Sequence, residues 1–203
     1  SAAGRIDPEP VVALPGMDFS GSLLVSQGKL LGVRYLADRT TTRWFDPAMA
    51  ATQAGVDSAL PQTVNLISMA RDAAAPYLVV TSYADVQPTS YSILNRATGQ
   101  LTPIGATLPR IKAEQMSKQQ LVHYQARDGL RIPAWLTVPQ HGSGKQLPLV
   151  VLVHGGPYLR GSSWQWDGEV QFLASRGYAV LEPEFRGSTG FGSKHFRAGW
   201  KQW

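Results

Sequence analysis

The chain has 203 residues, of which 43% are hydrophobic and 16% are charged, with 20 glycines, 14 prolines and a formal net charge of +5. A charged fraction below the usual ~25%, combined with many turn-forming residues, indicates short strands and frequent turns rather than long solvated helices, and the apolar content excludes wholesale disorder. The absence of cysteine excludes a disulfide scaffold, a cysteine nucleophile and a thiolate metal site. The net charge is −1 over residues 1–101 and +6 over residues 102–203, which favours two segments of different character.

The distribution of charged and apolar residues indicates which classes of partner are not expected. Basic residues are scattered singly, without a run of five, so nucleic-acid binding is not predicted. The longest apolar run, residues 147–153, is broken by Pro148 and is far too short for a membrane span. The sequence shows no signal peptide and no lipidation motif. We expect a soluble protein without nucleic-acid or membrane partners, and its compartment, cytoplasmic or periplasmic, stays open.

The first 120 residues are predicted to be mainly antiparallel β structure after an irregular lead-in over residues 1–20. Asp46 and Pro47 mark the start of one short helix, which we expect to end near Gly55. Regular spacing of strands and polar turns is typical of a sandwich or a propeller, and no exact repeat decides between them. The predicted strands cover residues 30–36, 41–45, 64–69, 77–82, 90–94 and 100–104.

The pattern changes after residue 120. A hairpin is predicted at residues 121–138, with Arg127-Asp128-Gly129 at its turn. The continuous apolar run at residues 149–153 is typical of a strand buried on both faces of a parallel sheet, and residues 178–181 predict a second such strand. Helical spacing over residues 166–176 predicts a helix that joins the two strands, and residues 193–203 resemble the opening of another helix. This order is the start of an α/β unit.

The most informative motif, His154-Gly155-Gly156-Pro157, directly follows the first of these strands. In α/β-hydrolases a backbone N–H from such a loop helps to form the oxyanion hole, and glycine lets a substrate carbonyl approach the backbone closely. Pro157 has no N–H, so the donor is expected at Gly156 or Gly155. A tight turn that leaves the edge of a sheet explains these four residues equally well.

Three segments in this order resemble the prolyl oligopeptidase family of serine peptidases, in particular its acylaminoacyl peptidase and dipeptidyl peptidase-like branch: VLVHGGP (151–157), QFLASRGYAVL (171–181) and FRGSTGFG (185–192). Residues 124–139 resemble the hairpin that leads into the hydrolase domain of the family, and Phe196, Ala198-Gly199 and Trp203 continue the pattern. The resemblance implies a mixed fold. Residues 1–120 would be the C-terminal blades of a partial β-propeller, and residues 121–203 would be the start of an α/β-hydrolase domain.

The chain departs from the family where the catalytic residues are concerned. The nucleophile of the family sits in a G-x-S-x-G elbow, but Ser163 lacks the second glycine and Ser188 lacks the first. The family order of serine, aspartate and histidine places the triad beyond residue 203, so we expect an internal fragment that contains no triad member and is inactive alone. Gly161 and Glu184 also depart, because relatives often carry Asp and Asn there, and this puts contacts of those side chains in doubt.

The resemblance implies that the parent protein is a serine peptidase that hydrolyses short peptides by acyl transfer, without a cofactor or metal. The backbone of Gly156, or of Gly155, would stabilise the oxyanion. His154, Pro157, Arg186 and Gly187 are predicted to shape the surrounding loops, Arg186 by pairing with a carboxylate. None of the four histidines has the spacing of a metal site.

Two questions stay open at this point, the specificity and the class of protein. Prolyl, acyl-aminoacyl and dipeptidyl specificity are not distinguished by the residues present. The alternatives to a peptidase are an esterase of the same fold, against which the β-rich first half argues, and a β-rich interaction module with a non-catalytic α/β appendage. Because the implied sheets are incomplete, their exposed edges predict association into a homo-oligomer.

Overall fold

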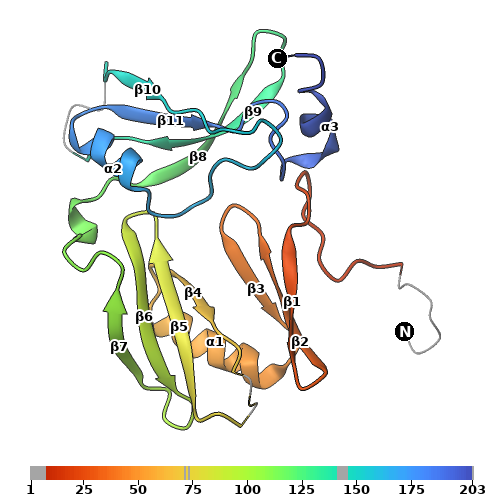
Figure 1. Cartoon of the computed structure of the whole chain (residues 1–203), viewed down its shortest axis with the longest axis vertical. Coiled ribbons are helices and arrows are strands. Elements are labelled where there is room, and N and C mark those ends of the chain that lie inside the picture. Colours follow the sequence, from red (N-terminus) through yellow and green to blue (C-terminus); the bar gives the residue numbers. More distant parts are fainter. Residues whose placement is uncertain (1–7, 71, 73, 141–145, 203) are drawn as a thin grey trace.

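The computed structural model describes residues 8–70, 72, 74–140 and 146–202. Figure 1 shows three β-sheets arranged in two tiers. The lower tier contains strands β1 to β7 and helix α1, and the upper tier contains strands β8 to β11 with helices α2 and α3. Within the described part of the chain, no helix has both the length and the apolar character needed to cross a membrane.

The lower tier consists of two antiparallel sheets. The first has the order β1 (Gly21–Ser26), β2 (Lys29–Leu36), β3 (Thr40–Trp44), and the second has the order β4 (Val64–Ile67), β5 (Tyr77–Ala84), β6 (Gln87–Asn95), β7 (Leu101–Ala106). All six strands predicted in this half are present with small changes at their ends. β1 was not predicted as a strand of its own.

Helix α1 (Pro47–Ala59) connects the two lower sheets. Asp46 caps it by accepting a hydrogen bond from the Met49 N–H at 3.1 Å. The helix continues past Gly55, its predicted end, because Val56 is 2% exposed and packs into the core with Met49, Ile67, Leu78, Val80 and Leu94. Burial of one more turn therefore extends the helix beyond the local stop signal.

The upper sheet has the strand order β10-β11-β9-β8. A short 3₁₀ turn, η1 (Ala113–Gln115), precedes the antiparallel hairpin of β8 (Gln119–Gln125) and β9 (Arg131–Thr137). β10 (Leu149–Val151) and β11 (Ala179–Pro183) are parallel, with Leu149 opposite Ala179, which confirms the predicted pairing.

Both helices of the upper tier are shorter than predicted. α2 (Gly168–Ser175) starts after residue 166 because the Asp167 side chain accepts hydrogen bonds from the N–H groups of Glu169 and Val170, each at 2.9 Å, and so caps the helix. α3 covers Gly192–Arg197 and ends there in a turn at Gly199. A Cβ on Gly199 would lie 2.8 Å from the Gly187 Cα, so glycine allows the chain after α3 to pass close to the glycine-rich loop. Trp203 lies outside the described residues.

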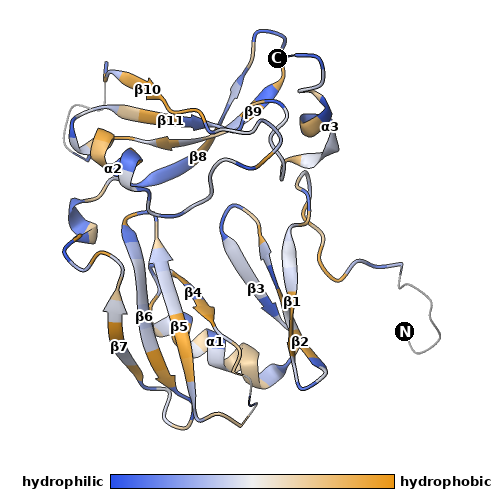
Figure 2. Ribbon diagram, in the orientation of Figure 1, coloured by the Kyte–Doolittle hydropathy of each residue, from blue (hydrophilic) through white to orange (hydrophobic). Residues whose placement is uncertain are grey.

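One burial prediction is wrong. Residues 149–153 are not buried on both faces: Leu149, Val151 and Val153 are 54%, 53% and 65% exposed. The reason is that β10 is the edge strand, whereas β11 lies between β10 and β9 and its Val180 is fully buried. Figure 2 shows the hydrophobic residues of β10 at the outer edge of the upper sheet.

Buried polar contacts join the two tiers beside α2. The Asp85 side chain, after β5, accepts a hydrogen bond from the Gln119 N–H at 2.8 Å. The Gln171 amide of α2 donates to the carbonyls of Asp85 and Ser117 at 3.1 and 2.7 Å. These groups are buried, so each bond satisfies a polar atom that would otherwise lose its contact with water.

Candidate functional site

The Gly-Gly turn lies at the carboxyl end of β10. Gly156 has φ = +135°, a conformation that favours glycine, and Pro157 follows it through a cis peptide bond. Gly155 and Gly156 are both exposed, and neither backbone N–H has a hydrogen-bond partner among the described residues. Two free N–H groups at the end of a parallel strand can stabilise negative charge that develops on a substrate oxygen.

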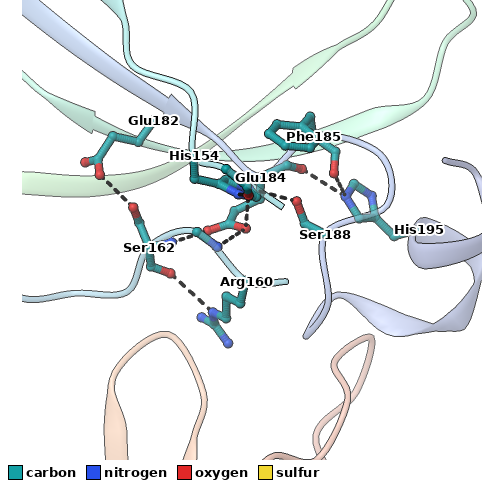
Figure 3. A network of polar contacts seen from close by, with 10 residues as sticks. His154, Arg160, Ser162, Glu182, Glu184, Phe185, Ser188 and His195 are labelled. Carbon is teal, nitrogen blue, oxygen red and sulfur yellow. Dashed lines mark hydrogen bonds and ion pairs between the residues drawn. The ribbon is translucent and has the colours of Figure 1, made fainter. Parts of the chain in front are cut away.

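The His154 ring connects the end of β10 to the glycine-rich loop at residues 186–192 (Figure 3). The ring stacks on Phe185, with 4.2 Å between ring centroids and 14° between planes. Nδ1 lies 2.6 Å from the Gly155 carbonyl oxygen, which can only accept, so Nδ1 carries the proton and donates. In the neutral ring, Nε2 then accepts a hydrogen bond from the Ser188 hydroxyl at 3.1 Å.

Glu184 anchors the loop that follows β10, at residues 161–162. It is fully buried, and its two carboxylate oxygens accept hydrogen bonds from the N–H groups of Gly161 and Ser162, at 3.0 and 2.6 Å. The His154 Nε2 lies 3.6 Å from one of these oxygens. Hydrogen bonds to an ionised acceptor are short and strong, so the buried carboxylate fixes the backbone at residues 161–162.

The two departures from the family pattern belong to one arrangement. A Cβ on Gly161 would overlap the ring atoms of His154, so glycine leaves the space that the ring fills. The Glu184 carboxylate then reaches the amides beside that ring. Gly161 and Glu184 are therefore in direct contact, through the hydrogen bond from the Gly161 N–H to the Glu184 carboxylate.

Glu182, two residues earlier on β11, forms a second anchor. It accepts a hydrogen bond from the Ser162 hydroxyl at 2.6 Å and one from the Gln119 side-chain amide at 3.2 Å. Burial raises the pKa of Glu182, and the charges of Asp167 and Glu184 act in the same direction, while the two hydrogen bonds oppose them. Ser162 is thus held through both its backbone and its side chain.

The glycine-rich loop is held from two sides. The Arg186 guanidinium donates to Asp128 at 2.9 Å, in the turn of the β8–β9 hairpin, and this hydrogen bond is the main cause that lowers the pKa of Asp128. The Gly187 N–H donates to the His195 carbonyl at 3.1 Å. His195 Nε2 in turn donates to the carbonyls of Glu184 and Phe185, at 2.9 and 3.0 Å, which locks α3 against the loop.

His154 and Ser188 do not form a catalytic pair, although their side chains meet. Ser188 is fully buried and cannot reach a substrate. In a catalytic triad the acid binds the histidine nitrogen opposite the serine, whereas here Glu184 and Ser188 both face Nε2 and a carbonyl oxygen occupies Nδ1. Among the described residues, no group of three or more His, Asp or Glu side chains could hold a metal ion, and His141 lies outside them.

Three residues of this site were not singled out from the sequence: Arg160, Ser162 and Glu182. A signal for Glu182 was present, because two glutamates alternate with apolar residues along a strand that reads as buried, and buried carboxylates need partners. Nothing in the sequence indicates that those partners are Ser162, 20 residues upstream in the loop after β10, and Gln119, 63 residues upstream on β8.

The structure thus joins a parallel strand pair, with an exposed glycine turn at one strand end, to antiparallel sheets. The fold is similar to that of a puromycin-hydrolysing peptidase of Mycobacterium tuberculosis, with a TM-score of 0.62 and 23% identity, over 96% of this chain and 30% of that one.

Comparison of the sequences identifies the family. The chain is 34% identical to dipeptidyl aminopeptidase BIII of Pseudoxanthomonas mexicana over 180 residues, which is 85% of the chain and 25% of the relative. It is 30% identical to dipeptidyl peptidase family member 6 of Caenorhabditis elegans over 162 residues, 70% of the chain and 22% of the relative. Residues 107–201 match the acetyl xylan esterase (AXE1) family. The chain belongs to the prolyl oligopeptidase family of peptidases and spans about a quarter of the length of the curated relatives it matches.

Proposed function

We propose that this chain is the part of a serine peptidase in which a β-propeller meets the start of an α/β-hydrolase catalytic domain, with the division near residue 120. The observation that carries the proposal is the pair of exposed N–H groups at Gly155 and Gly156, which have no partner in the described part of the chain, in a chain 34% identical to a dipeptidyl aminopeptidase. These two N–H groups would be the oxyanion donors of the enzyme.

The reaction would be acyl transfer. A serine hydroxyl from outside this chain attacks the scissile carbonyl carbon and loses its proton to a histidine, and the carbonyl oxygen becomes an oxyanion. The Gly156 or Gly155 N–H donates to that oxygen. Collapse of the intermediate expels the amine, which takes up the proton, and water then hydrolyses the acyl-enzyme by the same route. One such donor typically contributes a factor of about 10²–10³ to kcat.

The substrate class follows from the relatives and the lower tier. One relative is named as a dipeptidyl aminopeptidase and the other as a dipeptidyl peptidase family member, which favours release of dipeptides from short peptides. The antiparallel sheets lie directly beside the loop at residues 154–167 (Figure 1), and Trp164 N–H donates to the Asp38 carbonyl at 3.1 Å. A propeller in this position would restrict access to small substrates.

Labelling with a fluorophosphonate probe tests the proposal. Residues 1–203 should not be labelled and should not hydrolyse dipeptidyl p-nitroanilides, because the nucleophile is missing. A longer protein that continues into a G-x-S-x-G segment should be labelled once, at that serine, and should hydrolyse the same substrates. Stoichiometric labelling of any serine in this chain would contradict the proposal.

Ester hydrolysis is the second candidate, and the match of residues 107–201 to the acetyl xylan esterase (AXE1) family favours it. The same N–H donors would serve either reaction, since both pass through a tetrahedral oxyanion. The ratio of kcat/KM for a dipeptidyl p-nitroanilide to that for p-nitrophenyl acetate separates the two. A longer protein that hydrolyses only the acetate would support the esterase.

A further inference from the structure

Arg160 lies where three separate segments meet. Its guanidinium donates to the Ala37 carbonyl at 2.7 Å, in the turn between β2 and β3 of the lower tier. Its Nε donates to the Ser162 carbonyl at 3.2 Å, within its own loop. In Figure 3 the side chain points away from Glu184 and towards the lower tier.

The third segment is the glycine-rich loop. The guanidinium lies over the Phe191 ring, 5.0 Å from its centroid, and a Cβ on Gly190 would be 3.2 Å from the Arg160 Cδ. The Thr189 N–H donates to the Leu159 carbonyl at 3.3 Å, so the two loops are also joined through their backbones. Burial lowers the pKa of Arg160, and the charges of Glu184 and Asp38 oppose that effect.

A second contact attaches the same loop to the same turn. The Trp164 N–H donates to the Asp38 carbonyl at 3.1 Å, and the Arg39 guanidinium lies 5.5 Å from the Trp164 ring centroid. Consecutive carbonyls of the β2–β3 turn, at Ala37 and Asp38, therefore each accept a hydrogen bond from the loop that carries the Gly-Gly turn.

The loop after β10 is consequently fixed at two points, one by a residue of the upper tier and one by the lower tier. Glu184 of the upper tier holds the amides of Gly161 and Ser162, and the β2–β3 turn of the lower tier holds Arg160. Gly156 is only four residues from Arg160 and has no hydrogen bond of its own to hold it among the described residues. The placement of its N–H thus depends on the anchors that follow it.

We propose that Arg160 is a positioning residue that couples the β2–β3 turn to the N–H groups of Gly155 and Gly156, so that these donors are ordered only while the two tiers are docked. The proposal deepens the proposed function and rests on it for its catalytic consequence. The planar guanidinium donates in two directions at once, to its own loop and to the turn, and a lysine ammonium cannot reproduce this fork.

The test compares Arg160→Lys with Arg176→Lys. Arg176 is an exposed arginine after α2 that lies over the Phe172 ring, 5.1 Å from its centroid, so it is a matched control outside the site. In the ¹⁵N-labelled chain, we expect backbone order parameters at Gly155 and Gly156 of about 0.85 in the wild type and the control, and below about 0.6 in Arg160→Lys.

A second variant keeps the test decisive if Arg160→Lys does not fold. Arg39→Ala removes an exposed side chain that steadies the turn against Trp164, and it should lower the same order parameters by a smaller amount. In a longer, active protein, Arg160→Lys should lower kcat by about 10–100-fold, because small displacements of catalytic groups have effects of this size, with little change in KM.

The results of these experiments distinguish the positioning role of Arg160 from the proposed function of the chain. Unchanged order parameters in Arg160→Lys, or in Arg39→Ala should the first variant not fold, would overturn the role of Arg160 whatever the activity. A rise in KM at constant kcat would show that Arg160 binds substrate instead and would also overturn it. If Arg160→Lys loses order at both glycines, and a longer wild-type protein hydrolyses neither peptides nor esters, the coupling is supported and the proposed function is refuted.

Discussion

Replacement of Glu184 by glutamine tests the central anchor of the site. The carboxylate accepts hydrogen bonds from two backbone N–H groups, at 3.0 and 2.6 Å, and it is fully buried. In Glu184→Gln, one of the two oxygens becomes an NH₂ group that faces an N–H donor. One charge-assisted hydrogen bond is lost, at about 1.5–3 kcal/mol, and a buried donor loses its partner.

Removal of a buried charge offsets part of this loss, so we expect a net decrease of about 2 kcal/mol in the free energy of unfolding. For a chain of this size that corresponds to a decrease in Tm of about 4–8 °C. Urea unfolding followed by tryptophan fluorescence, together with calorimetry, measures both quantities.

Glu169→Gln is the matched control, because it makes the same chemical change at an exposed position in the first turn of α2. Exposed substitutions of this kind change stability by less than about 0.5 kcal/mol. If Glu184→Gln is as stable as Glu169→Gln, or more stable, the carboxylate does not hold the loop and the reasoning is refuted.

Three further predictions concern neighbouring features. Gly161→Ala should displace the His154 ring, shift its resonances in NMR spectra and decrease the free energy of unfolding by about 1–3 kcal/mol. The control Gly55→Ala, in open space on α1, should be neutral or stabilising. Equal stability of the two variants would contradict the packing described. Burial raises the pKa of Glu182, so the folded chain binds the proton of this carboxyl group more tightly than the unfolded chain, and stability should fall as pH rises above the ordinary value of 4.5. In Glu182→Gln, urea midpoints measured between about pH 4 and 8 should decrease less steeply than in the wild type. Equal pH dependence of the midpoints in the two proteins would disprove this effect. The exposed apolar edge of β10 should cause self-association, which Val151→Lys should weaken; light scattering that shows a wild-type monomer of 22 kDa with a cooperative melt would refute it.

Local sequence signals predicted most of the secondary structure because alternation and turn residues act over a few positions. They failed where tertiary contacts decide. Strand β1 was missed because its apolar residues do not follow the alternation of apolar inward and polar outward residues that marks a half-buried strand. Leu23 and Val25 are 65% and 51% exposed. The run at residues 149–153 reads as a central strand, but only the strand order shows that β10 is at the edge.

The Gly-Gly turn could be found from sequence because its four residues follow a strand directly. The groups that hold it could not, because they are distant in the chain. Arg160 donates to the Ala37 carbonyl, which is 123 positions away in the sequence. Every residue has a backbone carbonyl, so the residue type at position 37 does not indicate this contact. From the sequence, Glu184 could be identified only as a residue that departs from the family pattern, because its partners are the backbone N–H groups of residues 161–162.

The most direct measurement is a crystal structure of a longer, active protein whose catalytic serine is covalently bound to a peptidyl phosphonate or aldehyde. The account predicts that the oxyanion of the adduct lies about 2.7–3.1 Å from the backbone nitrogen of Gly156 or Gly155. An oxyanion more than about 4 Å from both nitrogens, bound by donors elsewhere, would contradict the assignment of this turn as the oxyanion site.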